Sequence, residues 1–431
     1  MNKELRKQKL TALQNGQTYM TGVRIQYKGE NLPFNVYKIP LEYLVYNKYN
    51  GRIGSLVKSF EKQNHLLDAT APNDIEVIEK FLLEINPQRN EFTMNSLAED
   101  GQRQHGIVTN EGVIIDGNRR AVLLNTIYRN REIWRAKGID VSASAYFIAV
   151  ILPEDINQKE IVKLETEYQM GEDAKLEYNP IEKYLRSRDL QNLHGFQISE
   201  IARMMGESKS NIEKYLQIME VMEDYLDYLG YQGIYTRLEK REGQFVDLNS
   251  YLKRYKNGNS SMADWNYQDI DIADLQTICY DYIRAQYEGK EFRYIAQASK
   301  SNSAFCKKAV WDVFSIDHLE DMQNVEEKPL DQYISENPDA DLTKLLRQRD
   351  EEWSRQVEND LKKNLGKAKR RLEDINEADQ PLQLAQKALE TLCSINTESD
   401  SFVSEELAQV LKQIGSLSYN YGKMIKNEMK K

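Results

Sequence analysis

The chain has 431 residues, which exceeds the size of one ordinary hydrophobic core, so we expect two to four domains. Its net charge of −10 argues against a protein that coats nucleic acid by bulk attraction, so any DNA contact must come from a local basic surface. The 3 cysteines lie far apart and form no CxxC or Cys/His cluster, which argues against a zinc site and against a disulfide framework.

The hydropathy of the chain excludes an obvious membrane protein. No stretch approaches the roughly 20 consecutive apolar residues of a transmembrane helix. The N-terminal segment contains basic residues but no apolar run of the kind found in secretory signals. We therefore expect a cytoplasmic protein without membrane contact.

The first part of the chain predicts an arm and two strands. Residues 1–35 form the arm, with a strand near Gly22–Tyr27, and a second strand begins at Asn35. The segment Leu41–Arg52 ends in a polar turn that Arg52 closes. An arginine at this position can contact a ligand or can simply be solvated, and the residues alone leave both possibilities open. Helical patterns follow at Ser55–Asn64, Asp74–Ile85 and Asn95–Asp100.

A glycine-bounded polar loop precedes the next strand. The loop runs from Gly101 to Gly106, contains Gln102, and leads into a strand at Ile107–Thr109. A turn then returns the chain into a second strand, Val113–Ile115, as in a hairpin. The connectivity therefore predicts that the Gln102 loop lies beside the turn that ends this second strand.

That turn is the strongest local signal in the sequence. Asp116, Gly117 and Asn118 are typical turn residues, and a helical pattern begins at Arg119. The N-terminus of a helix attracts anions, whereas Arg119 and Arg120 place two cations there. A bound phosphate would resolve this conflict, because each guanidinium can bind two phosphate oxygens.

Two interpretations of this turn remain open from the residues alone. In the first, the arginines hold phosphate, and Asp116 orients an arginine, caps the helix or reaches a bound Mg²⁺. In the second, the turn lies at the surface and its arginines pair with nearby carboxylates.

The next elements are a buried strand and a polar helix. The segment Ala143–Leu152 is the most apolar strand of the chain and is expected at the centre of its sheet. A long helical run begins after Pro153 and contains Glu165 and Glu167. These two glutamates could hold Mg²⁺ beside phosphates, although an ordinary solvated helix face explains them more simply.

The segment Ile198–Gln217 has the pattern of a helix-turn-helix. Ala202, Gly206 and Ile212 occupy the positions of the small crossing residue, the turn glycine and the branched anchor of the second helix. A second helix that starts at Ser208 would expose five residues for a DNA groove, namely Ser208, Lys209, Ser210, Glu213 and Lys214. Of these, Ser208, Lys209, Ser210 and Lys214 are the expected DNA contacts. Acidic residues balance the basic ones here, so a purely structural helical hairpin remains the alternative to DNA binding.

The C-terminal half is helical. Residues 227–325 predict a helical domain of unknown role. It contains basic clusters at Arg237–Arg241 and Lys253–Lys256. These clusters either contact the phosphate backbone of a nucleic acid or form solvated helix faces. Residues 326–431 predict an acidic linker and an amphipathic tail, in which one long helix ends at Pro381. Such a tail favours dimerisation or partner binding, so we expect a homodimer.

In this order, the motifs resemble the ParB/sulfiredoxin-like superfamily in its ParB arrangement. Asn47–Arg52 is similar to the first sequence motif of the family, a turn of the type N-P-x-x-P-R that we call the first box, although its prolines are absent here. Gly101–Ile107 is similar to the glutamine-containing loop of the family. Gly117–Arg120 stands where the family has G-E-R-R. Glu165–Gln169 and Asn179–Glu182 resemble its E-N-x-Q-R and N-P-x-E segments. The sulfiredoxin branch is set aside because it needs a cysteine where this chain has Asn118.

The resemblance implies an α+β fold. A small ParB/sulfiredoxin-like mixed α/β domain would occupy residues 36–155, an all-α helix-turn-helix domain residues 156–226, and a helical region the remainder. The family binds a nucleoside triphosphate, CTP or ATP, with Mg²⁺. The residues implied for the phosphates are Gly117, Asn118, Arg119 and Arg120. The residues implied for contact with the rest of the ligand are Arg52 and Gln102, and those implied for the metal are Glu165 and Glu167. For catalysis we expect Asp116, Arg119 and Arg120.

Three functional hypotheses follow. The first is a ParB-like DNA-binding protein in which triphosphate binding, with slow hydrolysis by metal and arginines, controls how two protomers close on DNA. The second is a nuclease or phosphotransferase of the same fold, of a kind found on mobile elements or in phage defence. The third is a binding module that has lost catalytic activity and that contacts a larger complex through its helical tail.

Overall fold

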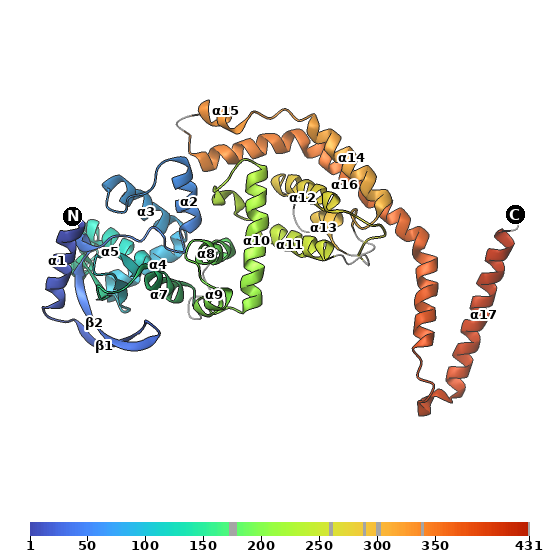
Figure 1. Cartoon of the computed structure of the whole chain (residues 1–431), viewed down its shortest axis with the longest axis horizontal. Helices are drawn as coiled ribbons and strands as arrows, with labels where there is room; N and C mark the ends of the chain where they lie inside the picture. The colour runs from blue at the N-terminus through green and yellow to red at the C-terminus, as the bar shows by residue number, and fades with distance from the viewer. Residues whose placement is uncertain (172–178, 258–261, 288–289, 299–302, 338–339, 430–431) are drawn as a thin grey trace. The chain divides into compact units, whose positions relative to one another are not determined.

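The computed structural model describes residues 1–171, 179–257, 262–287, 290–298, 303–337 and 340–429 (Figure 1). The chain divides into two compact units, Met1–Ala368 and Lys369–Lys431, and each is described by itself. In the described part of the chain, none of the helices combines the length and the apolar character that crossing a membrane requires. The fold is mixed α+β, with one 5-stranded sheet and many helices, as the sequence predicts.

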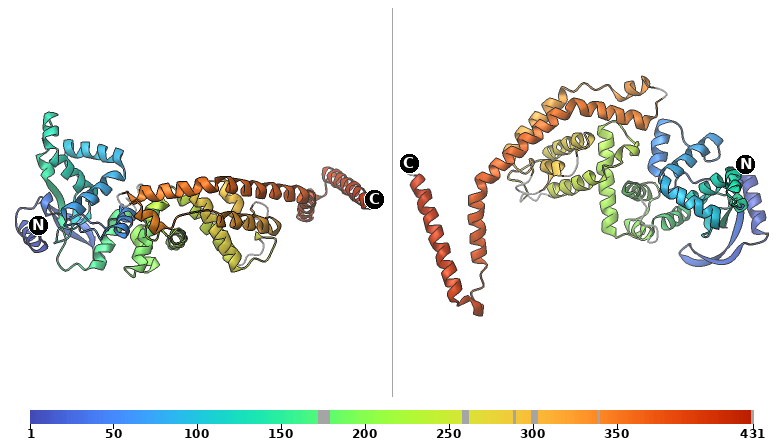
Figure 2. Two further views of the ribbon diagram at one scale, coloured as in Figure 1. Left: turned by 90° about the horizontal axis from the view of Figure 1, so that it is seen from above. Right: turned by 180° about the vertical axis from the view of Figure 1, so that it is seen from behind.

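The sheet lies in the first unit and has the order β1-β2-β5-β3-β4. Its strands are β1 (Met20–Tyr27), β2 (Glu30–Pro40), β3 (Gly106–Val108), β4 (Ile114–Asp116) and β5 (Tyr146–Ile151). Only the β3–β5 pair is parallel; the other three pairs are antiparallel. The apolar strand β5 is central, which confirms the prediction, and β3 and β4 form the predicted hairpin. The predicted N-terminal strand is the edge strand β1, and Figures 1 and 2 show it with β2 as a long curved hairpin.

Alternating side chains divide the sheet into two buried faces. Tyr37 and Ala149 belong to one hydrophobic cluster, and their neighbours Val36 and Val150 belong to another. The helices that contribute to the first cluster are α1 (Lys3–Gln14), α2 (Gly54–Gln63), α3 (Pro72–Glu84), α4 (Pro87–Asp100), α5 (Asn118–Arg129) and α6 (Arg131–Ala136). The helix α7 (Gln158–Met170) packs on the second through Leu164. This period of two is what a sheet buried on both faces requires.

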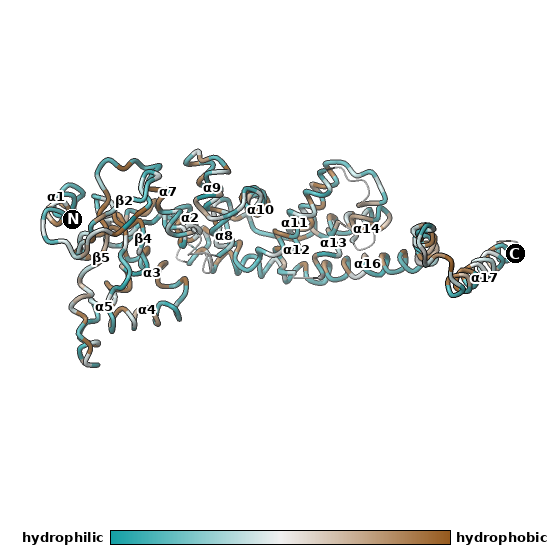
Figure 3. The backbone as a smooth tube through the Cα atoms, turned by 90° about the horizontal axis from the view of Figure 1, so that it is seen from below, coloured by the Kyte–Doolittle hydropathy of each residue, from teal (hydrophilic) through white to brown (hydrophobic). Residues whose placement is uncertain are grey.

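The rest of the first unit is helical. After α7 come α8 (Pro180–Asn192), α9 (Ile198–Met205), α10 (Lys209–Tyr228), η4 (Tyr235–Leu238), α11 (Glu242–Lys256), α12 (Asp269–Arg284), α13 (Lys290–Ala296), α14 (Lys308–Gln323) and α15 (Leu330–Ser335). The long helix α16 (Leu342–Cys393) follows, and α17 (Glu405–Glu428) ends the chain. Figure 3 shows hydrophobic and hydrophilic residues alternating along α16, and its apolar residues Leu346, Val357 and Leu361 are buried.

Two expectations about the C-terminal half are corrected. Arg237 and Arg241 are neither solvated nor on a phosphate-binding surface: both are buried, Arg237 in an ion pair with Asp350 and Arg241 against the hydroxyl of Tyr225. The helix α16 also continues through Pro381 instead of ending there. A proline inside a helix removes one backbone hydrogen bond, which a helix of 52 residues can tolerate.

A buried carboxyl group joins α2 to α8. Glu182, in the first turn of α8, is 5% exposed and accepts hydrogen bonds from the backbone N–H of Ser55, at 3.1 Å, and from the Ser55 hydroxyl. Burial raises the pKa of Glu182 to about 7, and the bonds from Ser55 only partly oppose this shift. The folded protein therefore holds a proton that the unfolded chain releases near pH 4.5.

The first prediction concerns the pH dependence of stability. Because the folded state binds this proton more tightly, the free energy of unfolding should fall as pH rises from 4.5 to about 7. The variant Glu182→Gln should lack this contribution, which amounts to about 3 kcal/mol over that range. Urea unfolding at a series of pH values measures it, with the exposed Glu213→Gln as the matched control. A Glu182→Gln protein with the wild-type pH slope would contradict the assignment.

Candidate functional site

The predicted strand, turn and helix are β4, Gly117 and α5. Gly117 has φ 105° and ψ 17°, a left-handed conformation that side chains other than glycine rarely adopt. A Cβ atom at this position would lie 2.6 Å from Cζ of Phe147. Both the backbone angle and the space therefore require glycine between β4 and α5.

The first turn of α5 is arranged to receive an anion. It contains no acidic residue, and Gly117 at the N-cap supplies no side-chain hydrogen bond to the helix. The N-terminal N–H groups and the helix dipole therefore present partial positive charge without an acidic side chain in this turn.

Asn118 fastens this turn to the predicted first box. Its side chain is 1% exposed; Oδ1 accepts a hydrogen bond from the backbone N–H of Asn47 at 3.1 Å, and Nδ2 donates to the carbonyl of Asn47 at 2.8 Å. Gln169 of α7 makes a second connection, because it accepts from the N–H of Gly51 and donates to the carbonyl of Ile115. The segment 47–52 is thus held against the start of α5 from two sides.

The first arginine of α5 lies in a cationic cluster. Arg119 donates to Asn90 Oδ1 at 2.6 Å and to the Thr93 hydroxyl at 3.4 Å, both on α4. Burial, and after it the positive charges of Arg52 and Arg89, lower the pKa of Arg119 to about 10. The positive charges of Arg52, in the segment 47–52, and of Arg89, in α4, therefore act on Arg119 at the start of α5.

Sequence reasoning predicted Arg52 and Arg119 but missed Arg89. Arg89 lies in a polar stretch before the short helix that the sequence predicted, and α4 in fact begins earlier, at Pro87. Nothing in the local pattern marks this arginine. Only the packing of α4 against α5 identifies it.

Arg120 and Asp116 have a different arrangement. The guanidinium of Arg120 donates to Asp116 Oδ2 at 2.6 Å, to the carbonyl of His105 at 3.2 Å and to that of Gln104. Asp116 thus orients an arginine, which is one of the roles expected for it. The described contacts of Arg120 hold the loop 104–105 against the turn, and they do not point to a phosphate-binding role.

Gln102 is bound to the backbone of the central strand. Its amide accepts from the N–H of Ile148 at 2.9 Å and donates to the carbonyl of the same residue at 2.7 Å. A further bond reaches the carbonyl of Gln104. Gln102 therefore anchors its loop to β5, and the structure does not bring its amide to the three arginines.

The two predicted metal ligands do not form a metal site. Glu165 is 2% exposed and pairs with Arg186 at 3.2 Å, and burial raises the pKa of its carboxyl group. Glu167 is half-buried and lies near Lys163 and Arg203. Within the described ranges, no group of three or more His, Cys, Asp or Glu side chains could hold a metal ion. Glu165 and Glu167 therefore do not fit as the ligands of a resident Mg²⁺.

The helices α9 and α10 meet at a tight turn. Gly206 has φ 60° and ψ 35°, and the Ser208 hydroxyl caps α10 by accepting from the N–H of Asn211 at 3.1 Å. Ala202 and Ile212 are buried where the helices cross. The residues predicted to contact DNA, Ser208, Lys209, Ser210 and Lys214, are all exposed at the start of α10.

Comparison with known proteins gives a weak likeness to solved structures. No protein-family model matches the chain, and no curated protein matches it. Among solved structures it is similar to the C-terminally truncated chromosome-partitioning protein ParB from Caulobacter crescentus complexed with CTP-gamma-S, with 14% sequence identity and a TM-score of 0.19. The match covers 50% of this chain and 92% of that chain. A likeness of this size assigns neither a family nor a ligand nor an activity to this chain.

The second prediction tests the need for glycine at the turn. Gly117→Ala introduces both a left-handed alanine and a contact with Phe147. Gly138→Ala introduces only the left-handed alanine, because no side chain or backbone other than that of its chain neighbours lies within 4 Å of the new Cβ. Gly138→Ala should lower the free energy of unfolding by about 1 kcal/mol. Gly117→Ala should lower it by about 2 kcal/mol more, because the core must shift around the new methyl group. Urea denaturation of the two variants tests this, and equal losses would contradict it.

Proposed function

We propose that this chain binds a nucleoside triphosphate at the N-terminus of α5, and that binding controls how the α9–α10 unit contacts DNA. The observation that supports the proposal is that the charges of Arg52 and Arg89 act on Arg119 at the start of α5, a helix whose first turn has no acidic residue. Such a set of charges is stabilised by a ligand that carries several negative charges close together.

A triphosphate fits this cluster better than a small anion. A single carboxylate offers one negative charge, and the cluster contains three guanidinium groups from separate elements. A triphosphate chain can pair with each of them and can also accept hydrogen bonds from the backbone at Gly117 and Asn118. CTP and ATP are the two candidates for the nucleotide. Mg²⁺ would enter with the phosphates, and Glu165 and Glu167 would not hold it.

The site is connected to the helices that carry the candidate DNA surface. Arg52 lies two residues before α2, and Ser55 of α2 is bonded to Glu182 of α8. The helix α8 in turn packs along α10. A ligand that moves Arg52 would therefore act on a continuous series of packed elements that ends at Lys209 and Lys214.

The catalytic role is proposed to be minor. A nuclease or phosphotransferase would need carboxylates at a metal, and Asp116 and Glu165 are instead paired with Arg120 and Arg186. We therefore place this alternative second, and we expect any hydrolysis of the bound nucleotide to be slow. We further propose that the protein acts in the cytoplasm as a homodimer, through exposed apolar residues of α17 such as Leu417, Met424 and Ile425.

The third prediction concerns triphosphate affinity. Arg52→Ala and Arg119→Ala should each weaken binding of the preferred triphosphate by about 10- to 100-fold, because each removes charge-assisted hydrogen bonds to phosphate. Calorimetry with each of the four nucleoside triphosphates, with and without Mg²⁺, measures this effect and identifies the nucleotide. Arg135→Ala, at an exposed arginine paired with Glu132, is the control. Unchanged affinity in both site variants would refute the proposal.

The fourth prediction concerns DNA. If Lys209 and Lys214 each contact a phosphate, replacing either with alanine should reduce the salt dependence of duplex-DNA binding, lowering the slope of log K against log salt by about 1. Binding titrations over a range of salt concentrations measure this slope. Lys80→Ala, at an exposed lysine of α3, should leave it unchanged. An equal effect of all three substitutions would show that the attraction is not located at α10.

A further inference from the structure

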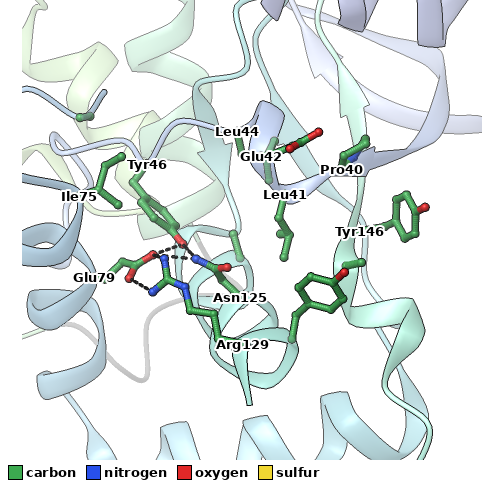
Figure 4. A pocket seen from close by; sticks show the side chains of 14 residues that line it. Pro40, Leu41, Glu42, Leu44, Tyr46, Ile75, Glu79, Asn125, Arg129 and Tyr146 are labelled. Atoms are coloured by element: carbon green, nitrogen blue, oxygen red, sulfur yellow. Dashed lines mark hydrogen bonds and ion pairs between the residues drawn. The ribbon is translucent and has the colours of Figure 1, made fainter. Parts of the chain in front are cut away.

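A cavity lies beside α5, and Arg52, Arg89 and Arg119 are not part of its lining. It has a volume of about 590 Å³, within the range of small-molecule sites. Ala121, Asn125 and Arg129 contribute to its lining from three successive turns of α5. Leu41 and Leu44 at η1 (Leu41–Tyr43), together with α3 and the start of β5, complete the lining (Figure 4).

One wall of this pocket is a fixed polar network around Glu79. The Glu79 carboxylate is 6% exposed and accepts from the Tyr46 hydroxyl at 2.9 Å, from Asn125 Nδ2 at 2.9 Å and from Arg129 at 2.7 and 3.3 Å. Figure 4 shows these groups converging on the carboxylate. Both oxygens of Glu79 are therefore occupied, and the carboxylate holds the other three side chains in position.

This network presents a donor and an acceptor to the cavity. The Arg129 side chain is 57% exposed although one edge of its guanidinium is held by Glu79, so its remaining N–H groups are accessible. Both described hydrogen bonds of the Asn125 side chain start from Nδ2. Its Oδ1 is consequently available to accept a hydrogen bond from a ligand.

The other walls are apolar and aromatic. Tyr146 lies across the pocket from Glu79 in Figure 4 and is 43% exposed. Tyr128 is 38% exposed, and Arg131 lies over its ring at 5.2 Å from the ring centre. Leu41, Leu44 and Ile75 add aliphatic surface. A flat ring could lie against the tyrosines while its polar edge meets Arg129 and Asn125.

We propose that this pocket binds a nucleobase or nucleoside, that is, a planar heterocycle without a triphosphate. A heterocycle carries donors and acceptors side by side on one edge, which matches the Arg129 and Asn125 pair. Within the lining, Glu42 and Glu79 outnumber Arg129, so a triphosphate would be repelled. This inference does not depend on triphosphate binding at Arg119.

The fifth prediction locates the pocket with a matched pair of substitutions. Ala145 lines the cavity and is half-buried, whereas Ala143 is exposed and does not line it. Ala145→Phe should fill the cavity and weaken binding at least 10-fold, and Ala143→Phe should leave affinity unchanged. Arg129→Lys keeps a charge beside Glu79 but removes the planar fork, so it should also weaken binding. Ligand-observed NMR on the full chain, with adenosine, guanosine, cytidine and uridine as probes, measures these affinities.

The Arg119→Ala variant separates this site from the triphosphate site. Nucleoside binding should survive Arg119→Ala, even though that variant should lose triphosphate affinity. The absence of binding by all four nucleosides at millimolar concentration would overturn the proposal. Binding that survives Ala145→Phe, or that disappears in Arg119→Ala, would place the nucleosides elsewhere and would overturn it equally.

Discussion

The candidate site depends on one buried pair of hydrogen bonds, between the amide of Asn118 and the backbone of Asn47. These bonds span 71 positions of the sequence and join the first box to the turn after β4. Leaving the backbone groups of Asn47 unpaired in the interior would cost about 1–3 kcal/mol for each group. A carboxylate at position 118 could accept from the N–H of Asn47 but could not donate to its carbonyl. The amide therefore suits both halves of this contact, and it fixes the segment that carries Arg52.

Two adjacent arginines at this turn have opposite electrostatic roles. Successive residues of a helix differ by about 100° in direction, so Arg119 and Arg120 face different neighbours. Arg120 meets Asp116 and two carbonyl oxygens, whereas Arg119 meets neutral side chains of α4 and the positive charges of Arg52 and Arg89. The first arrangement stabilises the turn by itself. Arg52 and Arg89 add positive charge around Arg119 at a helix N-terminus, and this is the physical reason for assigning an anionic ligand to Arg119.

Local sequence patterns were sufficient to predict the main strands and helices of the fold. The change from period two to a helical period at Gly117, the apolar run of β5 and the glycine between α9 and α10 each identify an element from a few neighbouring residues. The site itself depends on longer-range contacts. Arg119 meets Asn90 from 29 positions away, and Glu165 is neutralised by Arg186 from 21 positions away. A glutamate on a helix looks like a metal ligand in the sequence, and only the folded chain shows the arginine beside it.

Buried polar contacts also connect the segment that contains Arg52 to α8 and η4. The segment that ends in Arg52 leads directly into α2, and α2 is held on two sides by buried polar bonds. Ser55 bonds Glu182 of α8, and Ser59 accepts from the N–H of Thr236 in η4 at 3.2 Å. The next residue, Arg237, is paired with Asp350 of α16 in the interior. Buried polar bonds are costly to break one at a time, so a shift of α2 requires α8 and η4 to move with it or to lose these bonds. The proposed effect of ligand binding at Arg52 on α10 would therefore pass through α2 and the buried polar bonds that tie α2 to α8.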